Sequence, residues 1–383
     1  MSRCLSTPRT GRSGLLSGAG RSFFRGLPAA AVVAVLAVLP LAAQRRVIRI
    51  PDIPGFQTLK GDFHTHTIFS DGNIWPVTRV DEAWRDGLDV LAIADHVEYL
   101  PHKESVPVDL NAAWKIAGPR AEEKNIILVH GAEITRDMPP GHLNALFIED
   151  ASLLALPDPL AVVEAAVKQG AFIQYNHPGW RHQEPDGIPK LYPIHLDLVA
   201  RGWLHGIEYF NTYEGYPLVL DMCRDHRLAV MGNTDVHDVV SEVYAAPAHS
   251  HRTMTLVFAG ERTAASVREA LFAGRTAAWC DDQLAGFEEF VAPIFAAAVK
   301  VGRPYHSNDK QIWFEVTNVS DIPFFLVKGP EGAPAELSVP AGSTVIVRAD
   351  KRYLAEPLSY EVRNVLVGTG RSLAVKLTVP AIS

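Results

Sequence analysis

The chain has 383 residues, 48% hydrophobic and 21% charged, with a formal net charge of −7 and only 3 Cys. This composition excludes a disordered polymer, a collagen, a small disulfide-built domain and a membrane protein with many spans. The length exceeds that of one average domain, so we expect one large core and a second, smaller one. The 15 His are unevenly distributed, since none precedes His64 and all but His306 lie between His64 and His251.

Residues 1–43 predict a secretory signal peptide. They carry five Arg and no acidic residue, and residues 27–43 form an uncharged apolar run that ends in Ala42 and Ala43. A positive start, a short apolar run and small residues before a cleavage point are typical of such a leader. We therefore expect an exported protein, periplasmic or extracellular after cleavage, with a stable membrane partner only if the leader is retained as an anchor.

The remaining chain is acidic. Without residues 1–43, the chain has 31 basic and 43 acidic residues, which gives a formal net charge of −12. This balance argues against nucleic acid as the main partner, because the phosphate backbone demands basic surface. Two Cys remain, Cys223 and Cys280, and the sequence leaves open whether they pair. The sequence also leaves the oligomeric state open.

Alternating apolar runs and amphipathic stretches follow a linker at residues 44–57 and predict repeated β-α units over residues 58–290. The expected strands are residues 59–64, 90–94, 126–132, 143–148, 171–175, 206–210, 228–231 and 254–258. The expected helices include residues 77–86, 112–123, 160–169 and 263–272. Polar, His-containing segments repeatedly follow the apolar runs, which favours a (β/α) barrel, because barrels place their sites at the C-terminal strand ends.

The character of the sequence changes near residue 290. Short alternating strands separated by Gly, Pro, Asn and Asp are expected at residues 311–316, 324–327, 344–348, 358–363 and 374–379. They predict a small all-β, sandwich-like domain over residues 296–383. It shows no recognisable site, so we expect a structural lid or an oligomer contact rather than a binding module.

The most informative stretch is residues 59–72, LKGDFHTHTIFSDG. Side chains at i and i+2 of a strand point to one face, so His64 and His66 can bind one ion. Asp71 follows in a Ser-Asp-Gly turn, whose Gly72 lets the backbone fold back toward the strand end.

Further metal-ligand residue types follow one apolar run after another. They are His96, Glu133, His142, His177, Asp235 and His237. Taken singly, each is better explained as structural polarity, but seven segments that each bring a ligand to the same place in the repeat predict a metal centre. Imidazole and carboxylate without thiolate suit Zn, Mn or Fe, and nine ligands suit three divalent ions.

These motifs, HTH with SDG, ADH, GAE, GH before a strand, NHP and TDVH, together resemble the PHP family, which contains polymerase-associated PHP domains and histidinol phosphatases. The resemblance covers about residues 58–282 and implies a distorted (β/α)7 TIM-like barrel with a trinuclear centre. Some family members have His where this chain has Asp71.

The resemblance also implies an assignment of the nine ligands to three ions. The first ion would be held by His64, His66, Glu133 and Asp235. The second would share Glu133 as a bridge and be held by His142 and His177. The third would be held by Asp71, His96 and His237.

Residues that would bind substrate or move protons are less evident in the sequence. Asp235 is a candidate orienting base, Arg252 a candidate phosphate clamp and His195 a candidate proton donor. Weaker candidates are Arg181, His182, Tyr213 and His205. Asp95 is expected to support a ligand from behind, whereas His130 has the strand parity of a non-ligand.

The leading hypothesis is an exported, metal-dependent phosphoesterase that hydrolyses a small organic phosphate with metal-bound hydroxide, with diesters slightly favoured over monoesters. The sequence contains no GxSxG elbow and no Cys-centred site, so we do not expect a mechanism with a covalent Ser or Cys intermediate. One alternative is an amidohydrolase-like enzyme that cleaves C–N or C–O bonds, since those barrels also begin with HxH. Another is a metal-binding PHP module without catalysis.

Overall fold

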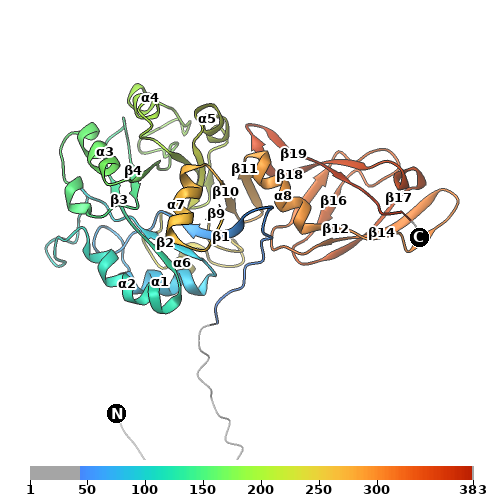
Figure 1. The fold of residues 1–383 in the computed structure, drawn as a ribbon, viewed down its shortest axis with the longest axis horizontal. Coiled ribbons are helices and arrows are strands. Elements are labelled where there is room, and N and C mark those ends of the chain that lie inside the picture. The colour runs from blue at the N-terminus through green and yellow to red at the C-terminus, as the bar shows by residue number, and fades with distance from the viewer. Residues whose placement is uncertain (1–43, 382–383) are drawn as a thin grey trace, which may run out of the picture. The chain divides into compact units, whose positions relative to one another are not determined.

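The computed structural model describes residues 44–381 of the chain (Figure 1). The predicted signal peptide, residues 1–43, lies outside the described residues. Within residues 44–381, no helix is both long and apolar enough to cross a membrane.

The first two thirds of the described chain form an α/β unit with a mostly parallel central sheet. Its strands are β1 (Gln57–Asp62), β2 (Val90–Ile93), β3 (Ile127–Ile134), β4 (Leu143–Leu146), β5 (Phe172–Tyr175), β6 (Gly206–Asn211), β7 (Glu214–Gly215) and β8 (Ala229–Asn233). β1, β2 and β3 pair in parallel, as do β5, β6 and β8. Most of these strands are buried along their whole length, as expected when both faces of a parallel sheet are covered.

Two of these strands run against a neighbour, the short β7 against β6 and, with a consequence for the site, β4. β4 is antiparallel to both β3 and β5. Its N-terminal end therefore lies at the sheet edge where the parallel strands have their C-terminal ends. This inversion explains why the predicted ligand His142 precedes its strand, whereas the other ligands follow theirs.

Helices cover the outside of these strands (Figure 1). They are α1 (Pro76–Arg85), α2 (Ala112–Lys124), the 3-10 helix η1 (Ala151–Leu154), α3 (Pro159–Lys168), α4 (Pro193–Ala200), α5 (Val219–His226), α6 (Val240–Val243) and α7 (Ala264–Phe272). α3 begins as its sequence predicts, because the Asp158 side chain accepts a hydrogen bond from the amide of Ala161 and Pro159 occupies the first turn.

The strands that follow β8 in the chain extend the sheet from β1 in antiparallel pairs and lead to the C-terminal part of the chain. β9 (Met254–Ala259) pairs with β1, β10 (Thr276–Cys280) with β9, and β11 (Gln283–Gly286) with β10. α8 (Glu288–Ala298) follows. β11 then pairs in parallel with β18 (Leu358–Gly368), so part of the chain after residue 298 extends the central sheet, a pairing that the sequence did not predict.

The remaining C-terminal elements are strands and one short 3-10 helix. They are β12 (Val299–Val301), β13 (His306–Ser307), β14 (Gln311–Asn318), β15 (Phe324–Val327), β16 (Leu337–Val339), β17 (Thr344–Asp350), η2 (Lys351–Leu354) and β19 (Arg371–Leu377). β12, β13, β14 and β17 form a second sheet, whereas β15, β16 and β19 join β18 in the first. One hydrophobic cluster runs from α1 and α2 through α8 into both groups of strands.

Every strand and helix predicted by residue range is present, with ends displaced by up to five residues, the largest displacement being at the C-terminal end of β18. The sequence patterns did not predict α4, α5, α8, β10 or β11. Cys223 and Cys280 are both buried and unpaired. The predicted domain boundaries stay predictions.

Candidate metal centre

The ends of β1 and β8 hold the first ligands at the centre of the fold. His64 and His66 directly follow β1 and are completely buried. Backbone hydrogen bonds join this segment to the chain after β8, from the His66 amide to the carbonyl of Val236 and from the Asp235 amide to the carbonyl of His64. Strands far apart in the sequence therefore place three ligands side by side.

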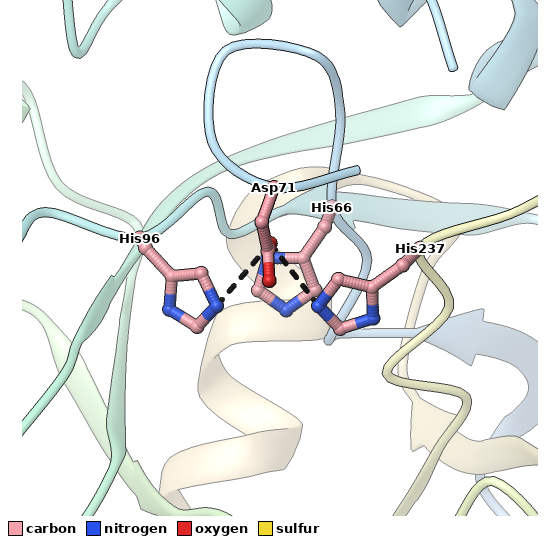
Figure 2. Close-up of side chains that lie close together, drawn as sticks. All are labelled: His66, Asp71, His96 and His237. Carbon is pink, nitrogen blue, oxygen red and sulfur yellow. Dashed lines mark ion pairs between the residues drawn. The ribbon is translucent and has the colours of Figure 1, made fainter. Parts of the chain in front are cut away.

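Asp71 lies at the middle of a group of imidazoles (Figure 2). Its Oδ1 is 3.2 Å from Nε2 of His237, 3.4 Å from Nε2 of His96 and 3.9 Å from Nδ1 of His66. These four residues offer ligand atoms close enough together to bind one ion. Gly72 makes the turn possible, because an added Cβ would lie 2.8 Å from the backbone of His66 and Thr67.

Glu133, at the end of β3, connects the ligands around it. Its Oε1 is 3.1 Å from Nδ1 of His142, 3.4 Å from Nε2 of His64 and 3.6 Å from Nε2 of His177. Its Oε2 is 2.7 Å from Nδ1 of His96. Glu133 belongs to two of the ligand groups in the described chain, one with His64 and His66 and one with His96 and His142. Glu133 therefore connects two candidate ligand groups.

Asp235 completes the cluster after β8. Its Oδ1 is 3.0 Å from Nε2 of His66 and 3.1 Å from Nε2 of His64, and its Oδ2 is 3.9 Å from Nε2 of His177. The structure thus brings all nine predicted ligands together. Its grouping differs from the implied assignment, since His66 also lies within the group around Asp71 and His96 also lies within a group with Glu133 and His142, whereas His177 and Asp235 belong to none of these groups.

Unpartnered polar atoms inside the cluster fit a metal. His64 Nε2 and Glu133 Oε2 are buried and have no geometrically acceptable hydrogen-bond partner. His64 Nδ1 lies 2.8 Å from Oε1 of Glu208, and because a carboxylate only accepts, Nδ1 carries a proton, which leaves Nε2, facing the other ligands, as the nitrogen that can bind a metal. A His held by a carboxylate in this way is the usual arrangement of a metal ligand.

Burial and crowding shift the pKa values of these ligands. Burial alone would lower the pKa of His96, but Glu133 and Asp71 outweigh it and raise this pKa to about 10. Burial alone would raise the pKa of Glu133, yet the surrounding imidazoles lower it well below its ordinary value. Burial, together with the neighbouring imidazoles, lowers the pKa of His66 to about 3. Without an ion, protons on some imidazoles therefore balance the carboxylates, and a divalent ion must displace them.

Three residues that line the site have a left-handed backbone, which is uncommon without glycine. Their φ angles are 29° at His177, 52° at Asp235 and 53° at Thr212. Such conformations cost free energy and persist where the surrounding structure imposes them, often at functional sites.

The cluster forms the floor of a cavity of about 500 Å³. Seven of the nine ligands line it, and His64 and His66 lie beneath the surface. Its other lining residues are Tyr99, Thr135, Trp180, Asn211, Thr212, Tyr213 and Glu214. A concave site with several ligand atoms at its base and walls of aromatic and polar side chains is suited to a small molecule.

Comparison with known proteins identifies the family. A solved two-domain protein from Bacteroides vulgatus, which contains a predicted PHP-like metal-dependent phosphoesterase, is 37% identical to this chain. The alignment covers 88% of this chain and 100% of the solved one, with a TM-score of 0.84. The chain belongs to the PHP-like family.

An uncharacterized protein of Methanocaldococcus jannaschii is 24% identical to this PHP-like chain over 201 residues, which are 49% of the chain and 87% of that protein. No family model matches the sequence.

Two of the predicted catalytic residues of this PHP-like protein do not reach the cavity. Arg252 is buried in an ion pair with Asp62, whose carboxylate also accepts the Thr234 hydroxyl. His195 is buried on α4, where Nε2 is 2.6 Å from the carbonyl of Pro140. Both stabilise the scaffold, and this geometry argues against the phosphate clamp and the proton donor expected from the sequence.

The weaker candidates divide in the same way. Tyr213 lines the cavity. Arg181 and His182 are exposed outside its lining, and His205 accepts a hydrogen bond from the amide of Ile173. His130 stacks on Trp114, 4.6 Å between ring centroids, as expected for a non-ligand.

Asp95 supports the Asp71 loop rather than a histidine. It accepts hydrogen bonds from the amide and hydroxyl of Thr67, both at 2.6 Å, and from the hydroxyl of Ser70 at 2.7 Å. Burial raises the pKa of Asp95, and these hydrogen bonds oppose the rise.

Glu208 is the most important residue that the sequence analysis missed. It is fully buried on β6 and accepts hydrogen bonds from His64, from the amide of His177 at 2.7 Å and from the side chains of Gln174, Asn211 and Asn233. A lone Glu in an apolar strand is itself a signal, because a buried carboxylate requires partners.

Arg79 was also missed. From α1 its guanidinium donates to the carbonyls of His66, Val236 and Asp238, at 2.8, 3.1 and 2.7 Å. It therefore fixes the ends of both ligand-bearing segments.

Proposed function

We propose that the protein is a metal-dependent phosphoesterase that hydrolyses a small organic phosphate at a centre of three divalent ions, Zn, Mn or Fe. A phosphodiester remains slightly favoured over a monoester. The observation that carries this proposal is the convergence of nine His and carboxylate ligands at the base of one cavity, where His64 Nε2 and Glu133 Oε2 make no hydrogen bond of acceptable geometry.

Divalent ions bound by these residues would supply activated water and would neutralise charge on the phosphate. The chain itself positions the ligands. Glu208 holds the tautomer of His64, Arg79 and Asp95 fix the loops that carry His66 and Asp71, and Asn176 donates to Glu133 Oε1 at 2.8 Å. Asp235 lies at the cavity floor, where it can orient a water molecule as well as bind metal.

The proposal extends to the architecture and the location of the protein. The isolated parallel bridge between Thr65 and Val236 supports closure of β1 to β8 as a (β/α)7 barrel. The two groups of strands after residue 298 support a sandwich-like C-terminal domain. We keep export to the periplasm or exterior as a proposal. N-terminal sequencing of the mature protein is expected to begin after Ala43, and an intact Met1 would contradict it.

The test of function combines metal analysis with turnover. The protein is stripped with a chelator, reloaded separately with Mn, Zn or Fe, and assayed with p-nitrophenyl monoesters and diesters. We expect one ester class to be hydrolysed and metal content to approach three ions per chain. Full metal loading without turnover of either ester by any metal would refute the phosphoesterase and favour the non-catalytic module.

Variants test the site separately. His64→Asn and Asp235→Asn are expected to abolish turnover and lower metal content. His306→Asn, an exposed residue on β13, is the control and should change neither. Unchanged kinetics in the two site variants would overturn the assignment. The amidohydrolase-like alternative predicts cleavage of amides, lactones or carboxylic esters, whose turnover without that of phosphate esters would favour it.

A further inference from the structure

The walls of the metal cavity carry aromatic rings and a carboxylate but no cation. Among the described residues that line it, none is Lys or Arg. Nearby cations are directed elsewhere, since Arg136 pairs with Glu98 at 2.6 Å and the Arg181 guanidinium lies over Gly187. A substrate group other than the reacting phosphate would therefore find no positive side chain here.

Three exposed aromatic residues from separate loops face this one cavity. Tyr99 follows β2, Trp180 follows β5 and Tyr213 precedes β7, with exposed fractions of 53%, 37% and 55%. Trp180 packs edge-on against His177 and Tyr99 against His96, so these rings stand beside the ligands. Large rings that remain exposed in a concave site, rather than packed in the core, mark a surface for a ring-bearing ligand.

Glu214 adds negative charge to the wall. It lies on β7 and is exposed, and its carboxylate accepts one hydrogen bond in the described chain, from the hydroxyl of Tyr216 at 3.1 Å. Within residues 44–381, no salt bridge neutralises the Glu214 carboxylate. A carboxylate or second phosphate on the substrate would approach Glu214 without a compensating cation, which is unfavourable by Coulomb repulsion.

We propose that the site takes phosphate esters whose organic part is a ring without negative charge, held by Tyr99, Trp180 and Tyr213, and that Glu214 discriminates against anionic substituents. This inference rests on the proposed function, because it identifies the substrate class of the same cavity. It makes Glu214 a specificity determinant that needs no contact with the ligand cluster.

A matched pair of ligands isolates the charge. 4-Carbamoylphenyl and 4-carboxyphenyl phosphonates have nearly the same shape and differ by one negative charge, and neither can be hydrolysed. Binding of each to the metal-loaded protein is measured by calorimetry, and the corresponding phosphate monoesters and methyl diesters are compared by kcat/KM. We expect the neutral ligand to bind about fivefold more tightly, the scale of one charge interaction at a hydrated surface.

Substitutions of Glu214 test whether this residue causes the preference for the uncharged ligand. Glu214→Gln should reduce the ratio to about twofold or less, and Glu214→Lys should reverse it. Glu356→Gln, an exposed carboxylate near the C-terminal end of the chain, is the matched control and should leave the ratio unchanged. Equal binding of the two phosphonates by the wild type, or an unchanged ratio in Glu214→Lys, would overturn the charge rule.

The ring site is tested with a ligand that lacks a ring. Trp180→Ala and Tyr213→Ala should each weaken aryl phosphonate binding about tenfold and leave methylphosphonate binding unchanged. Tyr305→Ala, a 58% exposed Tyr in the C-terminal strands, is the control. Equal losses for aryl and methyl ligands would overturn the ring site. If no ester is turned over, the proposed function fails, while the phosphonate measurements still decide this inference.

Discussion

Replacement of Glu208 by Gln should weaken both the fold and the metal site, although Glu208 contacts no reacting group. The change keeps the size of the side chain and replaces one acceptor oxygen with an NH₂ group. His64, Gln174 and Asn233 donate to Oε1, and the His177 amide and Asn211 donate to Oε2. Whichever way the amide turns, its nitrogen faces at least two donors.

The magnitude follows from these contacts. Each hydrogen bond to a buried charged acceptor contributes about 1.5 kcal/mol or more, so two lost bonds lower the free energy of unfolding by about 3 kcal/mol. Loss of the group that holds the tautomer of His64 should lower metal affinity about 10- to 100-fold. Urea unfolding of the metal-free protein measures the first effect, and competition with a chelator of known affinity measures the second.

A second buried Glu provides the control. Glu184 is 2% exposed and accepts hydrogen bonds from Tyr192 and Lys190, both at 2.6 Å, but it does not line the cavity. Glu184→Gln should therefore destabilise the fold without changing metal affinity. If Glu208→Gln and Glu184→Gln lost metal equally, or if Glu208→Gln bound metal like the wild type, the positioning role of Glu208 would be refuted.

Three further predictions concern the ligand loop, the buried arginine and pH. Gly72→Ala should displace the Asp71 loop and lower metal content by about one ion per chain, measured by elemental analysis, and full occupancy would contradict the tight turn. Arg252→Gln should lower the free energy of unfolding by about 3–5 kcal/mol, because Asp62 is left as a buried charge, while KM in the folded fraction stays near wild type; a raised KM with unchanged stability would restore the phosphate clamp. The pKa of His96 is about 10 in the folded, metal-free protein and about 6.5 in the unfolded chain. Protonation of His96 therefore stabilises the metal-free fold fully below pH 6.5, and this contribution is lost as the pH rises toward 10. Thermal unfolding in chelator should show this fall, and metal-loaded protein, in which His96 is already deprotonated, should not.

The ligand positions could be predicted because they follow a rule of topology. Parallel strands deliver their C-terminal ends to one edge, so His96 after β2 and Glu133 at the end of β3 meet without any knowledge of the loops. His142 obeys the same rule only because β4 is inverted, which the sequence pattern alone did not show. The Ser-Asp-Gly turn was predictable for a local reason, since its glycine permits a close backbone approach.

The supporting residues were not predictable in the same way. Arg252 stands before an apolar strand, much as the ligands stand after theirs, but its side chain turns to Asp62. Arg79 lies on an amphipathic helix with nothing local to distinguish it from a surface residue, and its acceptors are carbonyls more than ten residues away. The partners of Arg252 and Arg79 are set by tertiary contacts, which the sequence does not show. The position of a strand end, by contrast, follows from the order of strands and helices along the chain.

The supporting charges explain how a cluster of nine polar ligands can exist inside a folded protein. Asp62 binds Thr234 and Arg252, and Arg79 binds the carbonyls of His66 and Val236, so the ends of β1 and β8 are joined by groups that take no part in metal binding. The ligands are therefore held in place by the scaffold, and protons can balance their charges until ions replace them. A fold that depends on this second set of contacts can lose its metal without losing its ligand geometry.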